Sequence, residues 1–299
     1  MHERENTDKN EVLKEMRQSM EHVSLSDIPC GPWVYHYTRA ETAIQHILHS
    51  GKLRLSSLRR TNDRDETEPW AIDARRVYGP PSAEDLNRYL TTARIYFQDQ
   101  AYLFSAAADE PHDLKSFTLG YGMRGFAMHS MWSHYGGRYA GVCLAFDSDA
   151  LSRAFAAQIV DGDAIYSGLV RYHSHVPTIA RTLDIYNVAM QGFENYLKMH
   201  LESHHMDLYF QKQYSWSYER EYRWIIHLSS SVYAHFYISF GEAIRAIFID
   251  DKCADGDVEA LRQAAHRWSI PLYRIVWSGM TPPGLRRIEF PAQSGIGEY

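Results

Sequence analysis

The chain has 299 residues, 45% of them hydrophobic and 23% charged, a composition that excludes a disordered or fibrous protein. Its 31 Lys and Arg residues against 37 Asp and Glu residues give a net charge of -6, which argues against a protein that coats DNA. No apolar run approaches the roughly 20 residues that a membrane helix needs, and no secretory signal is visible. Together with three isolated cysteines, these features predict a cytoplasmic protein without a membrane segment.

The first thirty residues differ in character from the rest of the chain. They are polar, but their apolar side chains recur at spacings that suit one amphipathic helix. These apolar positions are Val12, Leu13, Met16, Met20 and Val23. We expect residues 1–30 to form a helical appendage that lies on the rest of the chain or on a partner protein.

A regular order of predicted strands and helices begins after Gly31. Residues 33–37 (WVYHY) are aromatic and β-branched, which predicts a strand. Residues 41–50 have helical apolar spacing and end at Gly51, where a helix C-cap glycine belongs. Residues 52–56 (KLRLS) alternate like a strand, so the opening is strand, helix, strand.

The remaining chain alternates short helices and strands without a repeat or a linker. A charged loop over residues 59–73 leads into a helix. Strands are predicted over residues 101–105, 140–146, 165–172, 219–228, 244–249 and 272–277, and helices over residues 126–135, 181–210 and 258–268, before a Pro/Gly-rich tail. The simplest prediction is a single α+β domain over residues 31–299.

A G-x-G-x-x-G pattern spans residues 120–125 and precedes a predicted helix and strand. In dinucleotide-binding folds such glycines let a pyrophosphate approach a helix N-terminus. The preceding residues 116–119 make a poor strand, although the fingerprint needs one there. A glycine-rich loop is therefore the favoured interpretation, with a dinucleotide site as the alternative.

Histidine is abundant, with 16 residues, but no metal-ligand pattern is present. His173 and His175 alternate and His204 and His205 adjoin, yet neither pair belongs to a recognised zinc spacing. No Gly-x-Ser-x-Gly elbow marks a serine nucleophile, and Cys143 in an apolar strand is typical of a core thiol. We expect no metal.

A charge-rich strand over residues 218–224 is the most informative local pattern. Because side chains alternate along a strand, Glu219, Glu221 and Arg223 would share one face. Such a cluster is either a structural ion-pair ladder or a site that holds a polar ligand. Taken alone, it favours the ion-pair ladder, since Arg and Glu satisfy one another.

Several short motifs recur in a fixed order along the chain. They are Tyr35-His36-Tyr37-Thr38, Gly51-Lys52-Leu53, Asn62-Asp63, Met131-Trp132-Ser133-His134-Tyr135, Gly141-Val142-Cys143-Leu144-Ala145-Phe146 and Tyr218-Glu219-Arg220-Glu221-Tyr222-Arg223. In this order they resemble the bacterial family known as domain of unknown function 2971, over roughly residues 33–250. The interval between Ser105 and Trp132 is longer than the family usually has.

The opening strand, its helix and the Gly-Lys-Leu turn also resemble ADP-ribosyltransferase-like domains, which cleave NAD. This likeness implies an α+β fold with a split mixed β-sheet core flanked by helices. It implies that His36 holds the adenosine ribose, that Tyr135 or Ser105 flanks the nicotinamide, and that Glu221 is the catalytic acid, with Glu219 completing an E-x-E pair. The implied nucleotide-binding set is His36, Tyr37, Thr38, Ser105, Trp132, Tyr135 and Arg223.

The functional expectation follows from that likeness. It is transfer of ADP-ribose from NAD, or NAD hydrolysis, onto a nucleic-acid or protein acceptor, as in a bacterial toxin or an anti-phage defence effector. A carboxylate would stabilise the oxocarbenium-like ribose, so NAD is a substrate and no metal is needed. The alternative is a non-catalytic nucleotide-binding or nucleic-acid-binding module of a defence or toxin-antitoxin assembly, in which Glu219 and Arg223 form an ion pair.

Overall fold

The computed structural model describes residues 21–23, 28, 31–75, 81–109, 124–229, 235–278 and 281–289. Its contacts divide the chain into two compact units, each assembled from separate stretches. The first unit takes residues 1–51, 109–149 and 242–299, and the second takes residues 52–108 and 150–241. The single domain expected over residues 31–299 stays a prediction.

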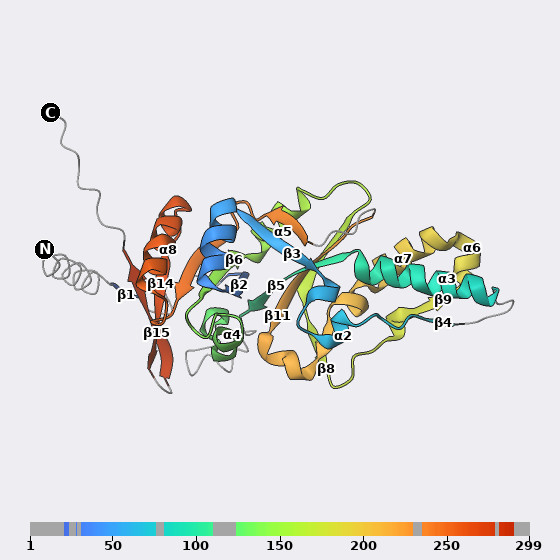
Figure 1. The fold of residues 1–299 in the computed structure, drawn as a ribbon, viewed down its shortest axis with the longest axis horizontal. Helices are drawn as coiled ribbons and strands as arrows, with labels where there is room; N and C mark the ends of the chain where they lie inside the picture. The colour runs from blue at the N-terminus through green and yellow to red at the C-terminus, as the bar shows by residue number, and fades with distance from the viewer. Residues whose placement is uncertain are drawn as a thin grey trace, which may run out of the picture. The chain divides into compact units, whose positions relative to one another are not determined.

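The first unit is built on a largely antiparallel sheet in the order β1-β15-β14-β13-β6-β2 (Figure 1). Its strands are β1 (Glu21–Val23), β2 (Trp33–Thr38), β6 (Val142–Asp147), β13 (Ile244–Ile249), β14 (Leu272–Ser278) and β15 (Thr281–Ile288). Its helices are the π-helix η2 (Thr42–Leu48), the 3-10 helix η6 (Gly125–Ala127), α4 (His129–His134) and α8 (Asp255–Arg267). Among these strand pairs only β13 and β14 run parallel.

Apolar strands and one docked helix form the core of the first unit. Residues 142–146 of β6 are all buried, which is typical of a strand covered on both faces. The helix η2 packs against α8, and the Trp268 indole donates to the Leu48 carbonyl at 2.9 Å. Gly51 ends this helix with a φ of 68°, as expected of a C-cap glycine.

The second unit contains an antiparallel sheet in the order β12-β3-β5-β11-β7. These strands are β3 (Lys52–Ser57), β5 (Ala101–Ala108), β7 (Ala164–Leu169), β11 (Glu221–His227) and β12 (His235–Ser239). Two short parallel pairs accompany it, β4 (Asp73–Arg75) with β9 (Thr182–Asp184), and β8 (Arg171–His173) with β10 (Gln211–Gln213). Both units thus combine largely antiparallel sheets with flanking helices, which confirms a mixed α and β architecture.

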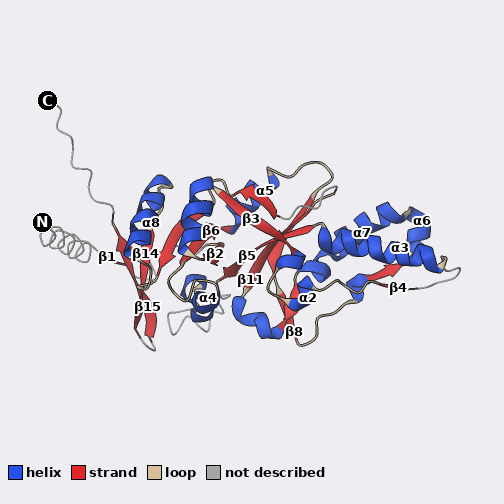
Figure 2. Ribbon diagram, in the orientation of Figure 1, coloured by secondary structure: helices blue, strands red, loops and turns tan. Residues whose placement is uncertain are grey.

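Helices supply most of the remaining mass of the second unit. They are η3 (Leu58–Arg60), α2 (Arg64–Thr67), α3 (Ala83–Arg94), η4 (Ile95–Asp99), most of α5 (Ser148–Ala156), η7 (Ile179–Arg181), α6 (Ile185–Gln191), α7 (Phe193–Tyr209) and η8 (Tyr214–Glu219). Figure 2 shows α3, α6 and α7 gathered beside β4, where they share one apolar core with η4. None of the described helices is both long and apolar enough to cross a membrane.

Two sequence-based predictions near the ends of the chain are wrong in their secondary structure. Residues Glu21–Val23 form strand β1 against β15, whereas a helix was expected through Val23; residues 1–20 lie outside the described part of the chain. The expected C-terminal tail begins with the strand β15. The mostly helical stretch expected over residues 181–210 is confirmed: after the short strand β9 it consists of α6 and α7, which Gly192, with a φ of 80°, separates.

Replacing Gly192 with alanine tests that interruption. Apart from the adjoining residues of the chain, no atom lies within 4 Å of the added Cβ, so the cost is backbone strain. Gly192→Ala should therefore lower the free energy of unfolding by about 1–3 kcal/mol. Gly256 in α8 has equal space without a positive φ, so Gly256→Ala should stabilise by roughly 0.4–1 kcal/mol. Urea denaturation measures both; stabilisation by both variants would contradict the assigned strain.

Candidate functional site

The second unit contains six buried charged side chains that form ion pairs or interact electrostatically with one another, here named the charged cluster. It consists of Asp63, Glu66, Lys212, Glu219, Glu221 and Arg223. None of these residues exposes more than 7% of its surface. Removing a charge from water costs several kcal/mol unless opposite charges and hydrogen bonds compensate, so the pairing within the cluster determines what it can do.

Three members of the cluster come from β11 and the turn before it. Glu221 and Arg223 lie two residues apart on β11, so their side chains share a face. Ser105 of β5 stands opposite Arg223 in the antiparallel register. Glu219 ends η8 rather than continuing the strand, because Arg220 has a left-handed φ of 45°. The predicted strand face is therefore wrong for Glu219, although its carboxylate still joins the cluster.

The other three members come from short elements. Lys212 lies in β10, which is paired with β8. Asp63 caps the N-terminus of α2, where its carboxylate accepts the backbone N–H of Asp65 at 2.9 Å. Glu66 follows on the buried side of the same helix. Two stretches of the second unit, residues 63–66 and residues 212–223, thus converge in the cluster.

Arg223 makes the largest number of contacts in the cluster. Its Nε and Nη2 atoms donate to the two carboxylate oxygens of Glu221 at 2.6 and 2.9 Å. Its Nη1 donates to the Tyr209 carbonyl at 2.8 Å, and Nη2 lies 2.5 Å from Glu66 Oε1. Burial alone would lower the pKa of Arg223, but Glu221 and Glu66 outweigh it and raise this pKa. The guanidinium therefore stays charged.

Lys212 is the second buried cation. Its Nζ donates to Glu219 Oε2 at 2.8 Å and more weakly to Glu221 Oε2 at 3.4 Å. The same nitrogen lies 4.5 Å from the ring centroid of Trp216. Burial opposes the charge, yet Glu221, Glu66 and Glu219 together raise the pKa of Lys212. Lys212 thereby links Glu219 to Glu221.

Glu221 receives donors on both carboxylate oxygens. The Ser105 hydroxyl donates a short hydrogen bond to Oε1, in addition to the contacts from Arg223 and Lys212. The Tyr172 hydroxyl accepts the backbone N–H of Glu221 at 2.9 Å. Burial would raise the pKa of Glu221, but Arg223 and Lys212 outweigh burial and lower it to about 2. Glu221 is therefore ionised at neutral pH and held in one orientation.

Carboxylates outnumber cations in the cluster, four against two, so its formal charge with all groups ionised is -2. Burial, with a further contribution from Glu66, raises the pKa of Asp63, opposite to the shift at Glu221. Environments that separate the pKa values of neighbouring carboxyls allow one to remain ionised while another can carry a proton. The cluster therefore has the composition of an acid and base site, and its excess negative charge favours a cation.

A small cavity of about 20 Å³ reaches the cluster beside Asp63, Glu66, Lys212 and Arg223. Its volume suits about one water molecule. Glu66 Oε2 is buried and has no hydrogen-bond partner among the described residues. The cavity adjoins an open pocket of about 380 Å³, with which it shares Trp70 and Arg181 among its lining residues.

Trp70 and Arg181 form a stacked pair at this pocket. The Arg181 guanidinium carbon lies 4.1 Å from the Trp70 ring centroid. Burial lowers the pKa of Arg181, while Asp65 and Glu66 act in the opposite direction. A polar ligand in the open pocket would thus meet a cation and an aromatic ring close to the charged cluster.

Five sequence-predicted residues lie in the first unit. His36, Tyr37 and Thr38 are on β2, Trp132 is in α4, and Tyr135 follows α4. The structure brings Tyr37 and Trp132 together, with ring centroids 5.2 Å apart. Both are buried: the Tyr37 hydroxyl donates to the Gly125 carbonyl at 2.5 Å, and the Trp132 indole donates to the Phe126 carbonyl at 2.7 Å. His36, Thr38 and Tyr135 are partly exposed.

Glu66 and Lys212 were missed by sequence reasoning. Residues 63–66 form an Asp-x-x-Glu pattern, which marks a helix N-terminus and could have drawn attention to this acidic pair. Lys212 stands between two glutamines, and no periodic pattern identifies it as buried. Only tertiary contacts reveal its role.

The remaining sequence candidates do not add a site. Among the described residues, no group of three or more His, Cys, Asp or Glu side chains is arranged to hold a metal ion. Cys143 is fully buried, and burial raises the pKa of its thiol well above the usual value, as expected of a core cysteine. Most of the glycine pattern at residues 120–125 lies outside the described residues.

Removing the buried ammonium tests the pairing. Lys212→Met leaves the Glu219 carboxylate buried without its cation, which should lower the free energy of unfolding by about 3–5 kcal/mol. Lys198 is an exposed lysine of α7, so Lys198→Met should change it by less than about 0.5 kcal/mol. Equal effects of the two substitutions in urea denaturation would refute the pairing.

The low pKa of Glu221 predicts how stability depends on pH. Its pKa is about 2 when folded and about 4.5 when unfolded, so the unfolded chain binds more protons in between. The stabilising contribution of Glu221 is complete above about pH 5 and disappears as the pH falls towards about 2. Denaturation at a series of pH values should show a shallower loss for Glu221→Gln than for the wild type. Parallel curves would contradict the assignment.

Comparison with known proteins found one family whose model covers part of this site. The model of the family described as protein of unknown function (DUF2971) matches residues 131–224. No curated protein and no solved structure matches the chain. The matched segment includes Lys212, Glu219, Glu221 and Arg223 of the charged cluster. The resemblance of this chain to the DUF2971 family is thereby confirmed over residues 131–224.

Proposed function

We propose that the protein cleaves the bond between nicotinamide and ribose in NAD and transfers ADP-ribose to an acceptor or to water. One observation carries the proposal, the hydrogen bond from Ser105 to Glu221 within the charged cluster. The likeness to ADP-ribosyltransferase-like domains assigns Glu221 as the catalytic acid and either Tyr135 or Ser105 as the residue beside the nicotinamide. The contact between Ser105 and Glu221 across two neighbouring strands supports this division of roles, because both side chains would then lie at the same end of the substrate.

The reaction places positive charge on the sugar. The bond from ribose C1′ to the nicotinamide nitrogen breaks, its electron pair leaves with neutral nicotinamide, and the ribose becomes oxocarbenium-like. An acceptor oxygen or nitrogen then bonds to C1′ and loses a proton to a carboxylate or to water. A fixed anion near C1′ lowers the barrier because it stabilises the developing cation without reorganising.

Glu221 has the properties that this role needs. It is ionised at neutral pH, and Ser105 and Arg223 fix its orientation. Arg223 and Lys212 offset part of the surrounding negative charge, but the carboxylates of Asp63, Glu66 and Glu219 outnumber them. Asp63, with its raised pKa, is the carboxyl suited to take the proton of the acceptor.

The proposal extends to the other residues named by the likeness. In an ADP-ribosyltransferase-like fold, His36 holds the adenosine ribose, and Tyr135 is the alternative to Ser105 beside the nicotinamide. Thr38 completes the nucleotide-binding set, and the buried Tyr37, Trp132 and Arg223 serve it only by positioning, through packing and ion pairing. The acceptor is a nucleic acid or a protein, and the activity is that of a toxin or an anti-phage defence effector.

Nicotinamide release is the direct test. Purified wild-type protein incubated with NAD and a panel of nucleic-acid and protein acceptors should release nicotinamide, measured by chromatography. Glu221→Gln should reduce the rate at least about 100-fold, since it removes the electrostatic stabilisation of the cation. His36→Ala should mainly raise KM.

The controls separate chemistry from folding. Ser105→Ala preserves every buried charge, and circular dichroism checks that each variant is folded. Glu202→Gln changes an exposed carboxylate of α7 and should leave the rate unchanged. If the wild type and the variants released no nicotinamide with any acceptor, the proposed enzymatic function would be excluded.

A second candidate function is a non-catalytic module that binds a nucleotide or a nucleic-acid end. It is favoured by the fact that both oxygens of Glu221 already accept hydrogen bonds while Arg223 is only 1% exposed. Under this function, Glu219 and its neighbours are an ion-pair scaffold. Calorimetric binding of NAD or ADP-ribose without nicotinamide release would select the module over the enzyme.

A further inference from the structure

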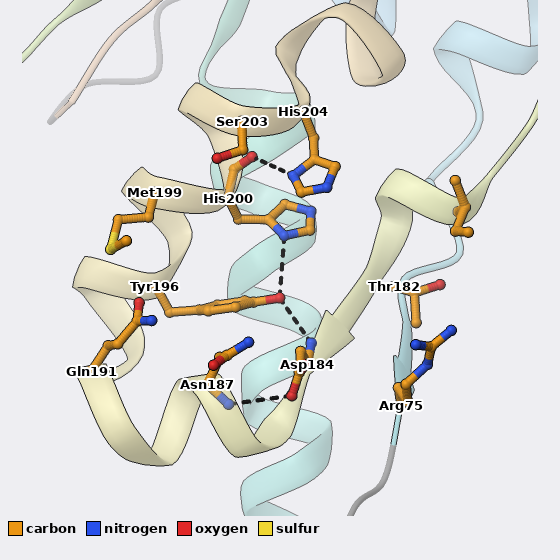
Figure 3. Close-up of a pocket in the computed structure, with 11 residues that line it drawn as sticks. Arg75, Thr182, Asp184, Asn187, Gln191, Tyr196, Met199, His200, Ser203 and His204 are labelled. Carbon is orange, nitrogen blue, oxygen red and sulfur yellow. Dashed lines mark hydrogen bonds between the residues drawn. The ribbon is translucent and has the colours of Figure 1, made fainter.

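The second unit has another pocket, of about 340 Å³, which we call the helical pocket (Figure 3). Helices α6 and α7 form one side, and Arg75 of β4 and Thr182 of β9 lie on the other. Its volume falls in the range of small-molecule sites. None of its lining residues belongs to the charged cluster.

One wall is fixed by a chain of hydrogen bonds. His200 Nε2 donates to the Ala180 carbonyl at 2.7 Å, so Nδ1 is the acceptor for the Tyr196 hydroxyl at 3.1 Å. That hydroxyl in turn accepts the backbone N–H of Asp184 at 2.8 Å. Burial lowers the pKa of His200 and keeps the ring neutral. The wall is therefore a preformed polar surface.

His204 presents a ring nitrogen on this wall. Its ring stacks on His200 with centroids 4.3 Å apart, and its Nδ1 donates to the His200 carbonyl at 3.0 Å. Because Nδ1 carries a hydrogen, Nε2 accepts a hydrogen bond from a ligand hydroxyl in the neutral ring and donates one in the imidazolium form. Nε2 has no hydrogen-bond partner within the described part of the chain.

Arg75 supplies an uncommitted cation. It is exposed, and no carboxylate pairs with it among the described residues. Asp184, the acid of the pocket, already accepts the backbone N–H groups of Tyr186 and Asn187 at 3.0 and 3.2 Å. The guanidinium is therefore available to an external anion, for which its fork of donors is well shaped.

Polar groups without partners complete the pocket. Gln191 Oε1 is buried and lacks a hydrogen-bond partner in the described structure. A buried acceptor left unpaired costs free energy, which a ligand hydroxyl would recover. Thr182 and Ser203 add hydroxyl groups to the lining. The lining thus offers Arg75, together with His204 in its imidazolium form, as donors for an anion, and it offers partners for sugar hydroxyls elsewhere.

We propose that the helical pocket binds a small hydroxylated phosphate monoester, of the size of a pentose phosphate, with Arg75 and His204 on the phosphate and Gln191 on a hydroxyl. The site is separate from the charged cluster and does not depend on NAD cleavage. It makes the second unit a receptor for a phosphorylated sugar in addition to its proposed reaction.

Isothermal titration calorimetry on the full chain tests the site with ribose 5-phosphate, ribose and inorganic phosphate. Ribose 5-phosphate should bind, and Arg75→Gln should weaken it about tenfold or more, because a charge-assisted contact is lost. His204→Gln and Gln191→Leu should each weaken it several-fold. Arg153→Gln alters an exposed arginine of α5 outside the pocket and should leave the affinity unchanged.

Three outcomes would overturn the proposal. They are absence of binding at millimolar ribose 5-phosphate, unchanged affinity in Arg75→Gln, and equal affinity for ribose or for inorganic phosphate. Arg75 is exposed, so its substitution does not threaten the fold. The titration does not measure nicotinamide release. Binding of ribose 5-phosphate can therefore be found or lost whatever the result of the Glu221→Gln assay, and the two proposals are tested independently.

Discussion

The guanidinium of Arg223 connects three parts of the second unit. It binds Glu221 on its own strand, Glu66 of α2 and the carbonyl of Tyr209 at the end of α7. At 1% exposure, no water can replace a missing partner, so all three elements must meet at one point. This constraint fixes β11 against the helices and orients Glu221 towards Ser105.

Such a network combines a structural and a chemical role. The ion pairs hold Glu221 in one orientation. A carboxylate that is already fixed in place can stabilise a developing cation without any free-energy cost of reorganisation. The excess of acids over bases distinguishes the charged cluster from a neutral ion-pair ladder, in which every charge would be cancelled. The helical pocket has the opposite character, since its arginine is exposed and without a carboxylate partner among the described residues.

Local sequence patterns predicted the structure correctly where interactions between residues close together in the chain determine it. The aromatic strand at β2, the alternating strand β3 and the glycine-terminated helix between them are confirmed, because side-chain periodicity and a C-cap glycine act within a few residues. The same reasoning failed at Glu219, where a left-handed Arg220 ends the strand, and at β1, whose three residues form a strand only through pairing with β15.

The sequence by itself determined a mixed α and β chain, the DUF2971 resemblance, and a charged strand containing Glu221 and Arg223. It also named the Ser105 that contacts Glu221, through a family likeness. The tertiary structure alone decided that Lys212 and Glu66 complete the charged cluster, that Trp132 and Tyr37 are core residues, and that Arg75 faces a pocket. Ion pairing and burial join residues far apart along the chain, and no periodicity in a sequence records them.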